Sequence, residues 1–317
     1  MRSKVLSVGS AVPDTILTNK DLEKYLDTTD EWITTRTGIK KRHVFPPGKE
    51  AWAYELGAAA SLKALKKASM APADVDCVIC ATFTPDYFFP STACKIQHAI
   101  GCTNAFAFDL SAACAGFVYA LTVVDGLITS GKCKTAIVVG AEVISKTLDW
   151  NDRSTAILFG DAAAAVVLQA VPESDGSGIL STFLKSDGSL GKILYIPAWG
   201  EKRTMSMNGG EVFKHAVRMM ADATCRVIDK AGLTREQIDL LIPHQANIRI
   251  MKAISQNLGL DKEKLITNVD KYGNTSSASI PLALEDAWLQ GKVKKGTVAA
   301  LTSLGGGVTV GSAIIRF

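Results

Sequence analysis

Asp109-Leu-Ser-Ala-Ala-Cys-Ala-Gly-Phe117 sets a cysteine where a predicted strand ends and a long apolar helix begins. Large apolar residues occupy every second position of 106–110, which is the period of a β-strand. Apolar residues then recur at spacings of three and four across 117–128, which is the period of a helix. Cys114 is therefore predicted to lie in the first turn of a helix that directly follows a strand.

The cysteine at this junction has two interpretations. The free N–H groups and the positive dipole end at a helix start lower the pKa of a thiol and increase the fraction of nucleophilic thiolate. That form attacks thioester carbonyls, so Cys114 is a candidate nucleophile. Free cysteine is also among the most buried residue types and often serves only as a small hydrophobe. Position alone leaves both interpretations open.

Composition limits the classes of protein that fit. With 317 residues, 47% of them apolar, the chain can bury a large core in one large domain or two. A formal charge of +4 is too small to indicate nucleic-acid binding, and the longest apolar run, around 162–168, is too short to span a membrane. The start of the chain lacks the apolar run of a signal peptide. Together with seven cysteines, this predicts a cytoplasmic protein.

Cys77 and Cys80 fall on opposite faces of a strand and cannot share a metal.

Strands and helices alternate along the chain, which predicts an α/β fold, and the pattern occurs twice. The matching segments are 65–76 with 228–239, and 127–140 with 288–302. Their offset of roughly 160 residues is much longer than the period of a solenoid. Two similar halves are therefore expected, 1–172 with the cysteine and 173–317, joined by a loop near 171–178. At this offset Cys114 matches the stretch around Asn274, so two polar sites should face one another.

Two polar residues of the second half occupy junctions of the same kind. His244 follows the apolar strand 239–243, and Asn274 precedes a predicted helix. Taken singly, His244 could be a buried structural histidine and Asn274 a helix cap. Their shared position at strand-to-helix junctions, beside the expected place of Cys114, favours a catalytic site.

Two further motifs each allow a structural and a functional interpretation. Trp32 and Arg36 share a helical face, where they could form a surface cation–π pair or hold a nucleotide by stacking and charge. Gly305-Gly-Gly307 precedes a strand rather than a helix, so it does not fit a dinucleotide-binding loop. It could form a tight hairpin or bring backbone N–H groups close to an oxyanion.

Four motifs together resemble β-ketoacyl-acyl-carrier-protein synthase III, and the likeness covers nearly the whole chain. They are Ala112–Phe117, Pro243–Arg249, Gly273–Ser276 and Gly305–Gly307. The resemblance implies the thiolase fold, with five αβαβα layers made of two pseudo-symmetric halves, and a homodimer. It also implies the first condensation of type II fatty-acid synthesis. An acetyl group passes from CoA to Cys114 and then condenses with malonyl-acyl-carrier protein, releasing CO2. Acetyl-CoA is then a substrate, and no prosthetic group or metal is expected.

The resemblance also implies roles for individual residues. Cys114 matches the nucleophile, and His244 and Asn274 match the pair that stabilises the enolate oxygen after malonyl loses CO2. An imidazole N–H and an amide N–H are both donors and could converge on one oxyanion. The backbone N–H groups of Cys114 and Gly306 match a second oxyanion hole. The matching CoA contacts are Trp32, Arg36, Arg153 and Asn247; the carrier-protein contacts are Lys214, Gln245, Ala246, Asn247, Ile248 and Arg249; the acyl-pocket residues are Phe159 and, from the neighbouring subunit, Phe89.

Two stretches depart from the family pattern. Gly160-Asp-Ala-Ala-Ala164 replaces a more glycine-rich turn, and Met207-Asn-Gly-Gly210 moves an asparagine, which puts one cofactor hydrogen bond in doubt. Other activities stay open: a condensing enzyme of secondary metabolism, an acyl-CoA hydrolase, or an inactive acyl-CoA-binding scaffold. The order Cys, His, Asn also occurs in papain-like proteases, but their signature around the cysteine is missing. No motif fixes the length of the acyl chain.

Overall fold

The computed structural model describes residues 1–46 and 48–317, which form two large β-sheets and two small ones. The first sheet has the order β1-β7-β6-β4-β5 and the second has the order β11-β12-β13-β8. The strands of the first sheet are β1 (Arg2–Ala11), β4 (Cys77–Ala81), β5 (Phe106–Leu110), β6 (Thr135–Glu142) and β7 (Ala162–Val171). Those of the second are β8 (Gly178–Ser186), β11 (Leu240–Pro243), β12 (Val298–Gly305) and β13 (Thr309–Arg316). The two small sheets each have two antiparallel strands, β2 (Ile16–Thr18) with β3 (Lys41–His43) and β9 (Leu194–Tyr195) with β10 (Ser206–Met207).

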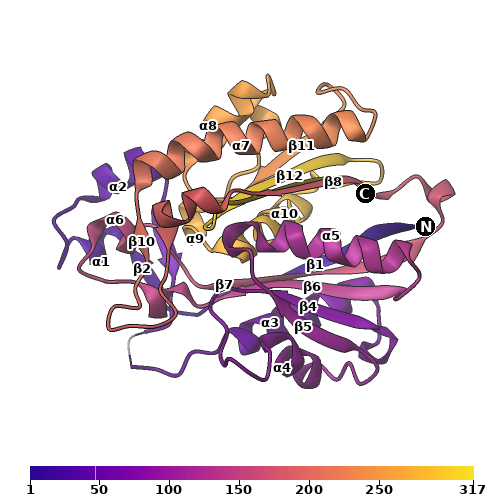
Figure 1. Cartoon of the computed structure of the whole chain (residues 1–317), viewed down its shortest axis with the longest axis horizontal. Coiled ribbons are helices and arrows are strands. Elements are labelled where there is room, and N and C mark those ends of the chain that lie inside the picture. The colour runs from indigo at the N-terminus through magenta and orange to yellow at the C-terminus, as the bar shows by residue number, and fades with distance from the viewer. Residues whose placement is uncertain (47) are drawn as a thin grey trace.

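Helices cover and separate the sheets, which gives five layers (Figure 1). α3 (Ala53–Ala68) and α4 (Thr92–Ala99) cover the outer face of the first sheet, and α7 (Gly209–Lys230) and α8 (Ile248–Asn257) lie outside the second. α5 (Gly116–Thr129) and α10 (Ser279–Leu289) lie between the two sheets. The short helices are α1 (Asn19–Leu22), α2 (Asp30–Thr37), α6 (Arg153–Ala156) and α9 (Val269–Tyr272). The predicted α/β class and the αβαβα arrangement are confirmed.

The middle layer explains why its helices are so apolar. α5 packs against strands of both sheets, and its buried side chains join one core cluster with strand residues from each half. A helix packed between two sheets leaves little of its surface to water, so polar residues are few. The strands β6 and β7 are likewise buried along most of their length, as expected for the centre of a sheet with helices on both faces.

The internal repeat is confirmed by the order and spacing of the elements. β11 begins 163 residues after β4, β12 begins 163 after β6, and α10 begins 163 after α5. The loop near 171–178 is also confirmed, because β7 ends at Val171 and β8 begins at Gly178. Cys77 and Cys80 belong to different core clusters, as their strand positions predicted.

Two 3₁₀ turns precede the middle-layer helices. η2 (Ala113–Ala115) leads into α5, and η7 (Ser276–Ala278) leads into α10. Cys114 therefore lies in η2 rather than in the first turn of α5, which corrects the predicted position by one turn. The two turns lie against one another near the centre of the molecule. Among the described residues, no helix is long and apolar enough to cross a bilayer.

Candidate active site

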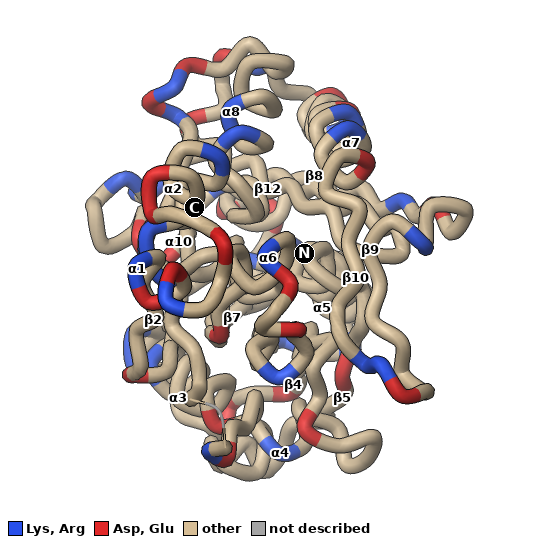
Figure 2. The backbone as a smooth tube through the Cα atoms, turned by 90° about the vertical axis from the view of Figure 1, so that its left-hand side faces the viewer, with Lys and Arg blue, Asp and Glu red and all other residues tan. Residues whose placement is uncertain are grey.

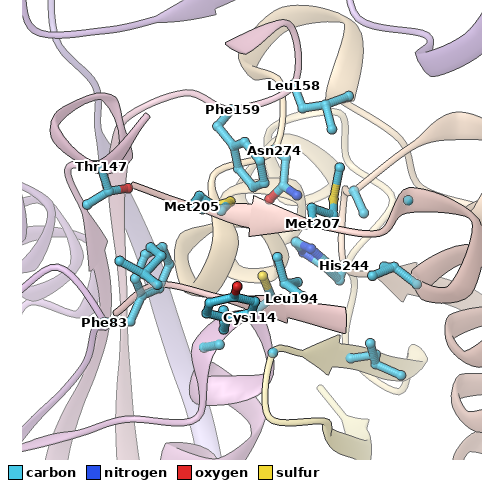
Figure 3. A pocket seen from close by; sticks show the side chains of 18 of the residues that line it. Phe83, Cys114, Thr147, Leu158, Phe159, Leu194, Met205, Met207, His244 and Asn274 are labelled. Atoms are coloured by element: carbon cyan, nitrogen blue, oxygen red, sulfur yellow. The ribbon is translucent and has the colours of Figure 1, made fainter. Parts of the chain in front are cut away.

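A cavity of about 930 Å³ lies where the two halves meet, and residues of both halves line it. Cys114 and Phe159 line it from the first half, and His244, Asn274 and Gly306 line it from the second. In Figure 3 the side chains of Cys114, His244 and Asn274 lie around one shared space. The structure therefore brings together the three residues that the sequence predicted to act together.

Cys114 sits at the floor of this cavity with only 7% of its surface exposed. The Ser276 hydroxyl donates to Cys114 Sγ at 3.3 Å, and Ser303 Oγ donates to the Cys114 carbonyl at 2.6 Å. Burial raises the pKa of the Cys114 thiol to about 12, although the hydrogen bond from Ser276 lowers it. The prediction that the start of the helix lowers this pKa is therefore wrong, because desolvation of the thiolate outweighs the nearby donors. The resting thiol is protonated and must lose its proton as it attacks.

His244 is held as a neutral imidazole. It follows β11, is buried, and its Nδ1 lies 2.6 Å from Ser279 Oγ. Ser279 Oγ also accepts the Gln245 N–H at 3.4 Å. A hydroxyl can donate one hydrogen bond and accept two, so its bond to Nδ1 fits either tautomer of the ring. In the tautomer in which Ser279 donates to Nδ1, Nε2 carries the imidazole hydrogen and is a donor. Burial lowers the pKa of His244 to about 3, which keeps the ring uncharged at neutral pH.

Asn274 is also oriented by a local hydrogen bond. Its Oδ1 accepts the Ser276 N–H at 2.9 Å, so its amide NH₂ is left to donate. The backbone of Asn274 pairs with the other half, because its N–H donates to Leu158 O at 2.8 Å and its carbonyl accepts the Gly160 N–H at 3.0 Å. Gly273 makes this approach possible, since it has a φ of 67° and a Cβ there would lie 2.7 Å from Leu158 O. Asn274 is therefore fixed in both backbone and side chain.

Gly306 lies in the turn between β12 and β13 and lines the cavity beside Cys114. A Cβ on this residue would lie 2.8 Å from the Leu194 carbonyl oxygen, so glycine is required for the close approach. The hairpin interpretation is therefore confirmed, because this glycine-rich turn joins the paired strands β12 and β13. The approach of its backbone N–H groups to an oxyanion stays a prediction.

The outer part of the site is aromatic and basic. Two guanidinium groups lie over the Trp32 ring, with Arg36 at 4.6 Å and Arg153 at 4.9 Å from its centroid. Figure 2 views this side of the molecule, where α2, α6 and α8 carry basic residues. Trp32, Arg36 and Asn247 line the cavity, and Asn247 also caps α8 by accepting the Arg249 N–H at 2.8 Å. The shared helical face predicted for Trp32 and Arg36 is confirmed.

The residues matched to carrier-protein contacts fall into three environments. Lys214 on α7 and Arg249 on α8 are exposed, and Arg249 lies 5.8 Å from the Phe213 ring. Ala246 and Asn247 line the cavity, and Ile248 packs in a cluster with residues of α2. Gln245 is buried and bonds to the backbone of Pro243, Ile266 and Asn268. The prediction that Gln245 contacts a partner protein is therefore wrong, because its side chain is buried and its polar atoms bond to the backbone of the same chain.

The apolar part of the cavity surrounds Phe159. Ile144, Leu148 and Met205 form a buried cluster with it, and Phe83 and Leu194 pack against this cluster. Figure 3 shows Phe83, Phe159, Leu194 and Met205 around the space next to Cys114. Phe89 is different, because 86% of its surface is exposed and it does not line the cavity of its own chain.

The two stretches that depart from the family pattern serve the scaffold. Asp161 is buried and accepts hydrogen bonds from the Ser145 N–H and hydroxyl and from the Phe45 N–H. Ala162 and Ala164 lie in β7 and pack against α10. Asn208 caps α7 by accepting the Glu211 N–H.

Sequence reasoning missed three polar residues of the site. Ser276 and Ser279 orient Asn274 and His244, and Ser276 also contacts Cys114. Glu142 at the end of β6 is fully buried and reaches toward η7. The spacing Asn-x-Ser could have indicated the turn at 274–276, but nothing in the sequence indicates that a glutamate ending an apolar strand lies beside the site.

No group of three His, Cys, Asp or Glu side chains that could hold a metal ion occurs in 1–46 and 48–317.

Comparisons with known proteins match this architecture. The family model "3-Oxoacyl-[acyl-carrier-protein (ACP)] synthase III" matches residues 108–188, and its C-terminal counterpart matches 228–317. The chain is 46% identical to β-ketoacyl-[acyl-carrier-protein] synthase III of Aquifex aeolicus, over all of both chains. It is 47% identical to synthase III 1 of Bacillus anthracis, over 100% of this chain and 99% of that one. The crystal structure of the Aquifex aeolicus protein superposes with a TM-score of 0.95, covering 99% of this chain and 100% of the other.

Proposed function

The chain belongs to the β-ketoacyl-acyl-carrier-protein synthase III family of acyltransferases, and we propose that it carries out the initiating condensation with Cys114, His244 and Asn274. In this proposal Cys114 takes a short acyl group from CoA, and the acyl group is then joined to a malonyl group on an acyl-carrier protein. The observation that carries the proposal is one cavity that is lined by a thiol from one half and, from the other half, by the His244 imidazole and the Asn274 amide, each bonded to a serine.

In the loading step, the Cys114 sulfur attacks the thioester carbonyl of acyl-CoA. A bond forms between this sulfur and the acyl carbon, and the bond from that carbon to the CoA sulfur breaks. The proton lost by Cys114 ends on the CoA sulfur, so CoA leaves as a thiol. The backbone N–H groups of Cys114 and Gly306 stabilise the oxyanion of the tetrahedral intermediate. Because burial keeps the resting thiol protonated, proton loss accompanies attack.

In the condensation step, malonyl thioester loses its carboxylate as CO2 and becomes an enolate. His244 Nε2–H and the Asn274 amide donate to the enolate oxygen, and a neutral imidazole can do so without losing its proton. The enolate carbon attacks the acyl carbon on Cys114, forming a carbon–carbon bond. The Cys114 sulfur leaves as a thiolate and takes a proton from water, which restores the thiol.

Substrate contacts follow from the outer part of the site. We propose that Trp32, Arg36 and Arg153 hold the nucleotide of CoA, because an aromatic ring beside two guanidinium groups suits a planar base that carries phosphates. Asn247 lies where the pantetheine arm would enter the cavity. Exposed Lys214 and Arg249 would meet an acidic carrier protein, and acetyl-CoA would supply the primer.

We also propose a homodimer that forms through β5. This strand is at the edge of its sheet and presents Phe106 and Phe108, which are 45% and 36% exposed. Apolar residues on an open strand edge favour pairing with another strand. Exposed Phe89 would then reach the acyl pocket of the second copy. Residues 1–172 and 173–317 would form the two halves of each subunit. Seven free thiols suit the reducing cytoplasm.

The proposal is tested by incubating the protein with acetyl-CoA and malonyl-acyl-carrier protein, and measuring CO2 and the carrier-bound product. We expect equal amounts of CO2, CoA and 3-oxoacyl-carrier protein. Free acetate without CO2 would indicate a hydrolase and contradict the proposal. CO2 without a new carbon–carbon bond would contradict the condensation step.

A further inference from the structure

The two 3₁₀ turns are each held by a strand of the other half. At the end of β12, Ser303 Oγ donates to the Cys114 carbonyl, and Gly305 lies so close to η2 that a Cβ would be 2.8 Å from Cys114 N. At the equivalent end of β6, Gly140 lies so close to η7 that a Cβ would be 2.4 Å from Ser277 O. Two residues farther along β6, the place equivalent to Gly305 is occupied by the long acidic side chain of Glu142.

The Glu142 carboxyl is completely buried and surrounded by donors. Its Oε2 accepts from the Thr84 hydroxyl at 2.6 Å, and from the Thr82 hydroxyl, the Phe83 N–H and the Thr84 N–H at 3.2 Å each. Its Oε1 lies 2.9 Å from Ser277 Oγ. Burying a carboxyl is costly unless it is hydrogen-bonded, and a fully bonded network is rigid. Glu142 therefore connects the loop after β4 in one half to η7 in the other.

The turn that Glu142 reaches also orients two reacting side chains. Ser277 is in η7, and the adjacent Ser276 donates its hydroxyl to Cys114 Sγ and its N–H to Asn274 Oδ1. Ser277 Oγ lies 2.8 Å from the Ala81 carbonyl at the end of β4. A shift of η7 relative to the first sheet would therefore move Ser276 away from Cys114 and weaken the bond that orients the Asn274 amide.

We propose that Glu142 is a positioning residue, which fastens η7 to the first half through Ser277 and so fixes Asn274 and Ser276 relative to Cys114. This inference rests on the proposed function of Asn274. It concerns a residue that touches none of the reacting atoms, so its loss should lower the rate of the condensation more than the binding of substrates. A displacement of about 1 Å in a reacting group can cost about 100-fold in rate.

Hydrogen positions in this network predict which substitution is tolerated. The Ser277 hydroxyl has one hydrogen and two acceptors in reach, Ala81 O and Glu142 Oε1. When Ser277 donates to Ala81, Oε1 must carry a proton to bond with Ser277. Burial raises the pKa of the Glu142 carboxyl to about 7, so this protonated form is accessible near neutral pH. A glutamine amide would make the same contacts, with its oxygen in the place of Oε2 and its NH₂ toward Ser277.

The test compares two hydroxyl deletions around the same carboxyl. Ser277→Ala removes both bonds from the Ser277 hydroxyl to the first half, to Glu142 and to the Ala81 carbonyl. Thr82→Val removes a donor to Glu142 from the first half and leaves η7 in place. When the concentration of malonyl-acyl-carrier protein is varied up to saturation, Ser277→Ala should lower kcat about tenfold with little change in KM. Thr82→Val should keep the kcat of the parent protein. Glu142→Gln should also keep it, whereas Glu142→Leu should lower it about 100-fold.

Equal kcat values for Ser277→Ala and Thr82→Val would overturn the proposal, as would a folded Glu142→Leu protein with parental kcat. If Glu142→Leu does not fold, the pair of hydroxyl deletions decides. If the parent protein releases no CO2, the proposed function fails, and the positioning role is then tested by alkylation of Cys114 with iodoacetamide. Ser277→Ala should change that rate severalfold and Thr82→Val should not; equal rates would contradict the role.

Discussion

The turns η2 and η7 are equivalent in the two halves but carry different chemistry. Each has a non-glycine residue in the left-handed region, Ala113 with φ 47° and Ser276 with φ 50°, and each leads into a helix of the middle layer. At the spacing of 163 residues, the position of Cys114 corresponds to Ser277. The Cys114 side chain lines the cavity, whereas Ser277 bonds to Ala81 and Glu142 inside the fold.

A duplicated scaffold can therefore hold an asymmetric site. The same turn geometry presents a nucleophile in one half and an anchor in the other. Because the anchored turn is rigid, the neighbouring Ser276 and Asn274 are placed to serve the nucleophile.

The largest effect is expected from exchanging the nucleophile. Cys114→Ser should abolish acyl transfer from acetyl-CoA, because a hydroxyl at its ordinary pKa is a far poorer nucleophile than a thiolate. Adding Ser277→Cys to this protein should not restore transfer, because position 277 does not line the cavity. Intact mass spectrometry after incubation with acetyl-CoA measures both. Acylation at position 277 would show that the two turns are interchangeable.

The next effect separates loading from condensation. His244→Ala and Asn274→Ala should each lower malonyl decarboxylation by on the order of 10² to 10³, the effect of losing one oxyanion donor. Loading of Cys114 should persist in both. Since burial lowers the pKa of His244 to about 3, decarboxylation by the parent should not lose activity through this residue between pH 5 and 8. Either variant loading poorly but decarboxylating normally would reverse the assigned roles.

A smaller effect tests the two close approaches that hold the turns. Gly305→Ala should push η2 away and slow loading, and Gly140→Ala should push η7 away and slow decarboxylation. Each adds a methyl group to a packed contact, at a cost of about 1–3 kcal/mol of folding stability. Thermal denaturation checks the stability, and separate assays of loading and CO2 release check the division. Identical effects on both steps would mean that the turns do not act separately.

The smallest effect is expected on KM for the carrier protein, and it compares α4, which follows β4, with α8, which follows the equivalent strand β11. On α4, Lys95 lies over the rings of Tyr54 and Tyr87, whereas Arg249 on α8 is exposed. Arg249→Glu should raise KM for malonyl-acyl-carrier protein severalfold at low salt, and leave loading from acetyl-CoA nearly intact. Lys295→Glu, an exposed control that precedes β12 at the end remote from Gly305, should leave KM unchanged. An unchanged KM for the Arg249 variant at low salt would remove this residue from the docking surface.

Much of the fold could be predicted because its signals are local and repeated. The period of two before Cys114, the period of helix after it and the recurrence of whole segments indicated an α/β protein with two similar halves. The grouping of Cys114, His244 and Asn274 also followed, because equivalent strand ends meet at one edge. Each of these inferences uses only neighbouring residues or the repeat.

The errors and omissions share a different cause. The pKa of Cys114 depends on how much water the fold excludes, and Gln245 is hidden by backbone contacts from distant segments. In the sequence Glu142 is only the polar residue at the end of a strand, and its contact with Ser277 of the other half exists only in the folded chain. Such properties arise from contacts between segments far apart in the chain, and no local pattern reports them.

The most direct test of the account is the site of acylation in the unaltered protein. After incubation with acetyl-CoA, peptide mapping by mass spectrometry should find one acetyl group, on Cys114, and none on the exposed Cys94. Buried Cys114 would thus react in preference to an open thiol, because only Cys114 lies in the cavity with donors arranged around it. An unmodified protein, or an acetyl group on Cys94 or another cysteine, would contradict the account.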